Sequence, residues 1–229
     1  MTNYKLALKQ SILSCAPVLP KSLTHRLRRT CDLLDTGRWL RERSLGRASA
    51  SFREREGIFD LIAETVRGKI VLYLEFGVFE GYSIKYWSKL LADPRAMLHG
   101  FDSFEGLPEH WKADHPKGRF ALGGAPPEIS DLRVKFIQGW FDQTIPLYVM
   151  PPHEQLIINI DCDLYSSTKY VLDHFKTSMP VGTVLYFDEF GSWDHESRAF
   201  REFVDDTHMQ FELVGESAAM WSAAFRRIG

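Results

Sequence analysis

Acidic side chains follow two apolar segments of the sequence, at the points where those segments end. Asp161 comes directly after Leu156–Ile160, and Asp188 and Glu189 follow Val184–Phe187. Carboxylates gathered in one cleft repel one another unless they share a proton or a cation. Because oxygen ligands suit a hard cation, this pattern predicts a divalent metal site, with Mg²⁺ as the expected ion. The alternative is that the acids cap a helix or pair with basic residues, and that only one of them faces a pocket.

A glycine-containing segment follows another apolar run. Glu75 is followed by Gly77 and Gly81 in the sequence EFGVFEGYS, and glycine lets the backbone turn sharply and bring its N–H groups close to a ligand. The spacing differs from the G-x-G-x-x-G pattern that seats a pyrophosphate. Asp102 ends the next apolar run, where a carboxylate can accept hydrogen bonds from ribose hydroxyls. Together these signals favour an adenosyl cofactor; the alternative is an ordinary strand-to-helix turn and a helix cap.

A general base would complete such a site, and histidine is the side chain whose ordinary pKa lies near neutrality. His115 is the preferred candidate for a catalytic base because it lies in the segment after Asp102 that we expect to cover the pocket. His110 in the same segment and His195 after the fifth strand are rivals. The competing interpretation of the two loop histidines is a solvated residue or a neighbour of Trp111.

Apolar runs of strand length alternate with helical segments from residue 70 onward, which predicts a parallel sheet with crossover helices. The last two runs follow each other with only a short turn, so we expect an antiparallel hairpin at the sheet edge. The predicted strands are Ile70–Phe76, Met97–Phe101, Val134–Ile137, Leu156–Ile160, Val184–Phe187, Phe211–Val214 and Met220–Phe225. This is the α/β arrangement of a Rossmann-like class I methyltransferase, with a seven-stranded, mostly parallel sheet. Its ligand site lies beyond the carboxyl ends of the strands.

The N-terminal segment differs in character from this core. Residues 1–55 carry 12 basic and 4 acidic side chains, whereas residues 56–229 carry 16 and 26. Helical spacing of leucines predicts short helices broken near Pro17 and Pro20. A capping box at Ser51–Glu54 predicts a helix that ends at Gly68. We therefore expect a basic helical extension over 1–68 and a cofactor-binding core over 69–229.

Composition narrows the class of protein. With 45% hydrophobic and 25% charged residues, the 229-residue chain has the makeup of a globular protein. A net charge of −2 argues against a strongly basic nucleic-acid-binding protein. Three cysteines without a C-x-x-C pair favour a reducing compartment. No apolar run approaches the about 20 residues of a membrane-spanning helix, so we expect a soluble, cytoplasmic protein.

Taken together, the motifs resemble the macrocin O-methyltransferase family of S-adenosylmethionine-dependent enzymes over roughly residues 70–207. The pairing of DSFEGLP with DCDLYSST is the most specific part of the resemblance. The segments that carry it are Glu75–Ser83 (EFGVFEGYS), Asp102–Pro108 (DSFEGLP), Gln138–Pro146 (QGWFDQTIP), Asp161–Thr168 (DCDLYSST) and Asp188–Glu189.

The resemblance implies a role for each matched position. Residues that would contact S-adenosylmethionine are Glu75, Gly77, Gly81 and Ser83 at the methionine part, Asp102 and Ser103 at the ribose, Phe104 stacked on the adenine, and Gln138, Gly139 and Trp140 over its edge, together with Asp161. The family's divalent ion would be bound by Asp161, Asp188 and Glu189. Members commonly have two aspartates at the end of the fifth strand, where this sequence has Asp188 followed by Glu189. Family substrates are often hydroxyls of natural-product sugars or of phenolic rings.

These expectations add up to an O-methyltransferase that acts on a hydroxyl of a small molecule or sugar, assisted by Mg²⁺, with Asp161 and His115 as catalytic residues. Nucleic acid and a membrane span are not expected, and the N-terminal helices offer a surface for a homo-oligomer. One alternative is a nicotinamide-dependent oxidoreductase. Another is a non-catalytic adapter that docks through the arginine-rich N-terminal segment on an anionic membrane or partner.

Overall fold

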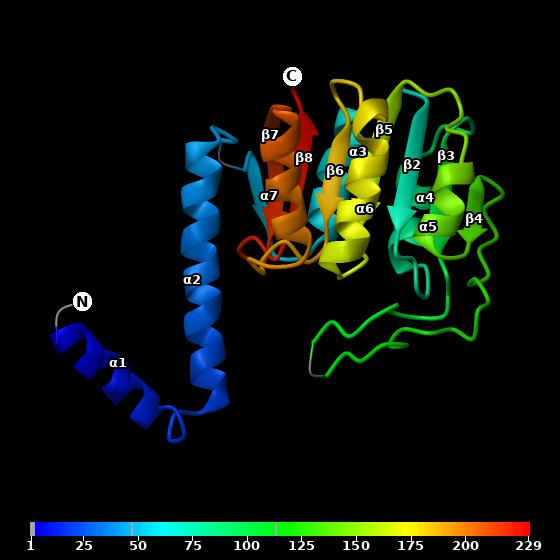
Figure 1. The fold of residues 1–229 in the computed structure, drawn as a ribbon. Coiled ribbons are helices and arrows are strands. Elements are labelled where there is room, and N and C mark those ends of the chain that lie inside the picture. The colour runs from blue at the N-terminus through cyan, green and yellow to red at the C-terminus, as the bar shows by residue number, and fades with distance from the viewer. Residues whose placement is uncertain (1–2, 47, 113) are drawn as a thin grey trace.

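The computed structural model describes residues 3–46, 48–112 and 114–229. In these residues, eight strands form one sheet in the order β1-β7-β8-β6-β5-β2-β3-β4, with helices on both faces (Figure 1). The strand pairs are parallel except for β6–β8 and β7–β8, which are antiparallel. The Rossmann-like class I methyltransferase fold and its C-terminal antiparallel hairpin are confirmed, and the sheet has one strand more than the seven that the sequence predicts.

The five central strands begin and end within one residue of their predicted bounds. Every residue of β2, β5 and β6 is buried, as expected for parallel strands covered on both faces, which appear in a sequence as continuous apolar runs. The strands are β2 (Val71–Phe76), β3 (Met97–Asp102), β4 (Val134–Gln138), β5 (Gln155–Ile160) and β6 (Val184–Phe187), followed by the hairpin of β7 (Phe211–Ser217) and β8 (Ser222–Arg227).

The sheet separates two clusters of buried apolar side chains, one on each face. Leu74 and Ile158 pack toward one face, and their chain neighbours Tyr73 and Ile157 pack toward the other, because successive side chains of a strand point to opposite sides. Helices α6 (Tyr165–Phe175) and α7 (Glu196–Thr207) cover the first face, and α3 (Glu56–Thr65) and α4 (Tyr82–Leu90) cover the second. The short helix α5 (Phe141–Thr144) follows β4.

The extra strand corrects the capping-box prediction. Ser51 does not begin a helix but lies in β1 (Ala50–Phe52), which pairs in parallel with β7, and α3 begins only at Glu56. The backbone groups of β1 bond to the open edge of β7, which would otherwise expose unpaired N–H and C=O groups. The division of the chain at residue 68 stays a prediction, although β1 already belongs to the core sheet.

The N-terminal segment forms α1 (Asn3–Cys15) and α2 (Lys21–Glu42), separated at Pro17 and Pro20 as predicted. The C-terminal part of α2 packs on the core, where the ring of Trp39 meets that of Phe200 edge-on at 5.9 Å. α1 lies away from the sheet (Figure 1). A homo-oligomer through these helices stays a prediction. Among the described residues, no helix combines the length and apolar character needed to cross a membrane.

Candidate active site

A cleft of about 1530 Å³ opens at the carboxyl ends of the central strands. It is centred where β2 and β5 lie side by side although they are not consecutive in sequence. In doubly wound sheets this reversal of strand order is where ligands bind, because the loops leaving the two strands diverge. The loop after β3 and the N-terminal half of α2 contribute further walls. The predicted location of the site is therefore a real cavity.

Gly77 determines how closely the loops of β2 and β5 approach each other. Its φ is +88°, in the left-handed region that favours glycine. A Cβ at this position would overlap the main-chain oxygen of Asp161. Gly81 also has a positive φ, +75°, and stands immediately before α4. Gly77 lines the cleft, whereas Gly81 is not among the lining residues and shapes the start of the helix.

The carboxylate of Asp102 connects two loops of the cleft. One oxygen accepts hydrogen bonds from the backbone N–H groups of Val78 at 2.8 Å and Phe79 at 2.9 Å, and the other accepts one from Phe104 at 2.8 Å. A carboxylate offers about four acceptor sites, so it keeps capacity for a ribose hydroxyl. Asp102 lines the cleft as predicted.

The remaining predicted cofactor residues divide into two sets. Ser83, Ser103, Gly139 and Trp140 line the cleft with Gly77 and Asp102. Gln138 points elsewhere, because its side-chain amide donates a hydrogen bond to the carbonyl of Gly124. The structure thus brings most of the predicted cofactor residues together from three strand ends.

Glu75 and Phe104 lie beneath the cleft rather than on its wall. Glu75 is 1% exposed and accepts a hydrogen bond from the hydroxyl of Tyr73. Burial raises the pKa of Glu75 to about 8, although that hydrogen bond and the charge of Arg55 act in the opposite direction. Phe104 is 1% exposed, and its ring packs edge-on against Phe136 in the core. The structure therefore does not bring the ring of Phe104 to the position that stacking on adenine requires.

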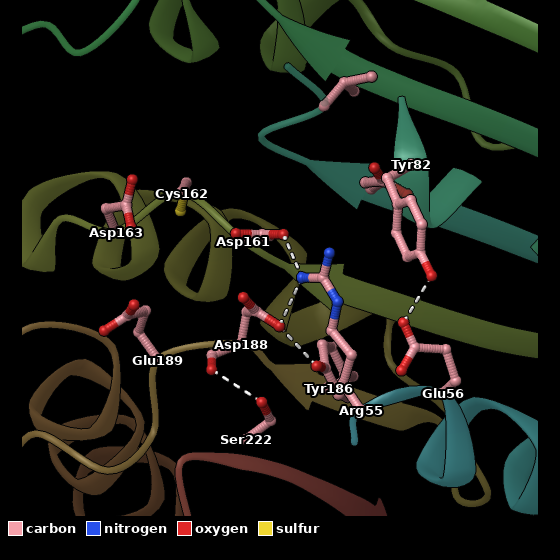
Figure 2. Close-up of polar contacts among 12 residues, drawn as sticks. Arg55, Glu56, Tyr82, Asp161, Cys162, Asp163, Tyr186, Asp188, Glu189 and Ser222 are labelled. Carbon is pink, nitrogen blue, oxygen red and sulfur yellow. Dashed lines mark hydrogen bonds and ion pairs between the residues drawn. The ribbon is translucent and has the colours of Figure 1, made fainter. Parts of the chain in front are cut away.

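The predicted metal ligands Asp161 and Asp188 share an arginine. Figure 2 shows the guanidinium of Arg55 between them: its Nη1 lies 2.9 Å from Asp188 Oδ1 and 3.4 Å from Asp161 Oδ2. The hydroxyl of Tyr186 donates to the same Asp188 oxygen at 2.6 Å, and that of Ser222 donates to the Asp188 carbonyl at 2.9 Å. The repulsion between the two carboxylates is thus offset by a cationic side chain.

Glu189, the third predicted ligand, also has a cationic partner. Its Oε2 lies 3.3 Å from Nζ of Lys112, which in turn stands 3.3 Å above the ring of Trp111. Across the described ranges, no group of three or more histidine, cysteine, aspartate or glutamate side chains is arranged to hold a metal ion. The three acids meet at one end of the cleft as predicted, but as ion pairs, and this arrangement does not fit the expected Mg²⁺ site.

A fourth acid, Asp163, lies on the same wall. Its φ of +62° turns the chain after β5 into the cleft. Burial and the neighbouring Glu189 raise the pKa of Asp163 to about 7, although Lys112 lowers it. A carboxyl group with this pKa exchanges its proton near neutral pH.

The buried carboxylate of Glu196 holds the ends of β5 and β6 in place. Its Oε1 accepts hydrogen bonds from the backbone N–H groups of Cys162 at 3.3 Å and Asp163 at 3.1 Å, and its Oε2 accepts one from Glu189 at 3.0 Å. Glu196 is fully buried at the start of α7. The sequence marks it only as the beginning of a helix, so its supporting role could not be predicted.

The preferred base, His115, lines the cleft in the loop after β3. Its Nδ1 lies 3.0 Å from Asp114 Oδ1, and its ring meets that of Trp111 at 5.0 Å between centroids. His195 also lines the cleft, and burial lowers its pKa. The rival His110 does not line it.

Three basic residues of α2 reach the cleft although no motif marks them. They are His25, Arg28 and Arg29. The guanidinium of Arg29 lies 5.0 Å above the ring of Trp221, which also lines the cleft. The only signal in the sequence was the excess of positive charge before residue 55.

Comparison with known proteins agrees with this geometry. The model of the macrocin O-methyltransferase (TylF) family matches residues 127–226. The resemblance to this family is confirmed. The macrocin O-methyltransferase match includes the acids at the ends of β5 and β6 and the segment Gln138–Pro146, but not the glycine loop after β2 or the DSFEGLP segment.

A curated relative from Streptomyces olivaceus is 27% identical over 150 residues, which are 57% of this chain and 56% of the relative. It is an 8-demethyl-8-(2,3-dimethoxy-alpha-L-rhamnosyl)-tetracenomycin-C 4'-O-methyltransferase. The match therefore spans little more than half of the relative's length.

Solved structures share the fold. The O-methyltransferase NovP superposes with a TM-score of 0.57 at 22% identity, over 76% of this chain and 78% of its own. CalS11, a calicheamicin methyltransferase, has the same TM-score and identity over 99% of this chain and 93% of its own. Apo CalS11, described as a TDP-rhamnose 3'-O-methyltransferase, gives 0.53 at 22% identity over 76% and 81%. These likenesses show a common fold.

Proposed function

We propose that the protein is an S-adenosylmethionine-dependent O-methyltransferase that acts on a hydroxyl group of a sugar. The observation that carries the proposal is that the family match at residues 127–226 includes Asp161, Asp163 and Asp188, which all line one cleft of a class I methyltransferase fold. The curated relative is a 4'-O-methyltransferase of a tetracenomycin that carries a rhamnosyl group, which supports a sugar acceptor.

The ends of β2 to β4 form the cofactor half of the cleft. S-adenosylmethionine supplies an electrophilic methyl group on a sulfonium centre when it is bound. Gly77 allows the loop after β2 to pass close to the main chain of Asp161, and Asp102, already fixed by the N–H groups of Val78 and Phe79, orients the ribose. Binding energy here is spent on orientation, which is the main requirement for methyl transfer.

The ends of β5 and β6 form the acceptor half, where a base must remove the hydroxyl proton. Asp163 and His115 both line the cleft, and we assign the role of base to Asp163. Its pKa of about 7 lies near the operating pH, which is the best match for a general base. The imidazole of His115 is engaged with Asp114 at 3.0 Å and is better placed to cover the acceptor.

The α2 wall carries Arg28 and Arg29 against one acid, Asp32, and this excess of positive charge favours an acceptor that carries phosphate. His25, Arg28 and Arg29 present donors to the cleft at the side of Trp221. Arginine binds phosphate oxygens through paired N–H donors, and an indole ring can stack on a base or sugar. A sugar nucleotide matches both features. CalS11 is described as a TDP-rhamnose 3'-O-methyltransferase, and TDP-rhamnose is a sugar nucleotide.

Calorimetry with S-adenosylmethionine and with its demethylated product tests the proposal directly. Both should bind the wild-type chain, and Asp102→Ala should weaken both by at least tenfold because the ribose loses its acceptor. NADH serves as the control ligand: it should not bind, whereas the alternative oxidoreductase requires that it does. Absence of binding of the demethylated product at millimolar concentration would disprove the proposed function.

A further inference from the structure

We propose that Arg55 takes the place of the divalent cation: its guanidinium neutralises Asp161 and Asp188 and donates a hydrogen bond to the acceptor oxygen, so that methyl transfer needs no metal ion. The catalytic part of this inference rests on the proposed function. The replacement of the cation rests on the geometry of the acid cluster alone.

The guanidinium lies between the two carboxylates where a shared cation would bind. Both contacts use Nη1, at 2.9 Å from Asp188 and 3.4 Å from Asp161. The Asp188 oxygen that faces Arg55 also accepts the Tyr186 hydroxyl. A Mg²⁺ ion needs oxygen ligands at about 2.1 Å in octahedral geometry. It could enter only by displacing Arg55 and rearranging Asp188.

Lys112 forms an ion pair with Glu189, which would be the third ligand of such a site. Its ammonium group lies 3.3 Å from Glu189 Oε2 and is held over the ring of Trp111. A doubly charged ion would therefore meet two positive side chains next to its three carboxylates. Since like charges repel strongly in a partly desolvated cleft, the two side chains compete with the ion at each of its ligands.

The ring of Tyr82, on the neighbouring helix α4, supports Arg55 in this position. It stands at the residue before α3, and its guanidinium lies 5.3 Å from the centre of the Tyr82 ring. The Tyr82 hydroxyl donates a hydrogen bond to Glu56 at 2.8 Å, as Figure 2 shows, and thereby fixes the ring. The arginine side chain is 28% exposed, so part of it faces the cleft, which it lines.

An arginine can supply the electrostatic part of the chemistry. A guanidinium has five N–H donors and stays charged at all relevant pH values. The contacts with Asp161 and Asp188 use Nη1 only, which leaves other N–H groups to donate to the acceptor oxygen. As the oxygen–methyl bond forms, the acceptor hydroxyl loses its proton to the general base in the cleft. The sulfur–methyl bond breaks at the same time, and its electron pair stays on sulfur. The arginine stabilises the negative charge that develops on oxygen.

Manganese binding followed by electron paramagnetic resonance tests the replacement without any assay of activity. Wild-type protein should not bind Mn²⁺ at millimolar concentration, and Arg55→Ala should gain a site because the two carboxylates lose their cation. Arg53→Ala is the matched control, since Arg53 is 95% exposed and, among the described residues, forms an ion pair only with its neighbour Glu54; it should behave as wild type. Stoichiometric Mn²⁺ binding by the wild type overturns the inference, and so does a folded Arg55→Ala variant that binds none.

Kinetics test the catalytic part. A chelator should leave wild-type turnover unchanged, and Arg55→Lys, which keeps a charge and protects the fold, should lower kcat by roughly 10²-fold, the usual effect of losing one preorganised donor. Mg²⁺ should restore part of the activity of Arg55→Ala. Loss of wild-type activity with the chelator contradicts the inference. If the demethylated cofactor does not bind at all, the proposed function fails, while the Mn²⁺ comparison still decides whether Arg55 replaces a cation.

Discussion

The two halves of the cleft are built in different ways. In the cofactor half, the residues that act together come from two strands that are consecutive in sequence: Gly77, Val78 and Phe79 follow β2, and Asp102 ends β3. In the acceptor half, the acids of β5 and β6 are neutralised by Arg55 from before β2 and by Lys112 from the loop after β3. A local motif therefore specifies the first half, whereas the second depends on contacts between distant segments.

The chemistry of the acceptor half gives the largest expected effect. Asp163→Asn should lower kcat by roughly 10²- to 10⁴-fold, the usual contribution of a general base. Because the base form of Asp163 increases as the pH passes its pKa of about 7, wild-type kcat should rise between pH 6 and pH 8. A pH–rate profile measures both. His115→Asn is the comparison: if it removes the titration and Asp163→Asn does not, the histidine is the base.

Gly77, where the loops of the two halves meet, gives the second largest expected effect, a loss of stability. Gly77→Ala should destabilise the fold by more than about 3 kcal/mol, because the new Cβ overlaps the Asp161 carbonyl in addition to the strain of a positive φ. Gly46→Ala is the control: its φ is +80° and a Cβ there meets no atom within 4 Å. It should show only the conformational cost of about 1 kcal/mol. Equal losses in denaturant unfolding would show that the close approach of the loops is unimportant.

Glu75, the buried carboxyl group beneath the cofactor half, should make the free energy of unfolding depend on pH. Since burial raises the pKa of Glu75 to about 8, the folded protein binds its proton more tightly than the unfolded chain does. Its contribution to stability is present at low pH and is lost as the pH rises through 8. Glu75→Gln should avoid this loss and gain about 4 kcal/mol relative to wild type between pH 5 and pH 9.

Thermal unfolding at the two pH values measures this difference. Glu64→Gln, on the outer surface of α3, is the control because that side chain is 65% exposed. It should show no comparable change with pH. A Glu75→Gln variant whose relative stability falls with rising pH would contradict the assignment.

The basic wall of the acceptor half should give the smallest effect. Arg28→Ala and Arg29→Ala should each raise KM for a sugar nucleotide by roughly tenfold with little change in kcat, since they bind a part of the acceptor remote from the reaction. KM for an uncharged glycoside should not change. Arg26→Ala, on the same helix but not on the cleft, is the control. Equal effects on charged and uncharged acceptors would argue against a phosphate-binding role.

Much of this molecule could be predicted from local sequence. The five central strands were bounded to within one residue, and in β2, β5 and β6 the reason is that the apolar runs are buried on both faces. Gly77, Asp102, Asp161 and Asp188 could be assigned to one edge, because the carboxyl ends of parallel strands meet there. The roles of individual residues in binding cofactor or acceptor stay predictions.

What local sequence could not reveal was which partner each acid finds. β1 forms because β7 leaves an open edge some 160 residues later, a fact that a capping box at Ser51 does not contain. The same rearrangement starts α3 at Glu56 and directs Arg55 toward Asp161 and Asp188. Phe104 is a further case, since its place in a matched motif suggested a ligand contact and its packing against Phe136 buries it.

The sequence by itself thus determined the fold, the edge of the sheet where chemistry takes place and the set of acids that gather there. Periodicity and glycine spacing are local properties, and they are sufficient for these features. The tertiary structure alone decided how the negative charge is balanced. Electrostatic pairing acts through space between segments with no fixed separation in sequence, and here it places Arg55 and Lys112 on the carboxylates that suggested a metal ion.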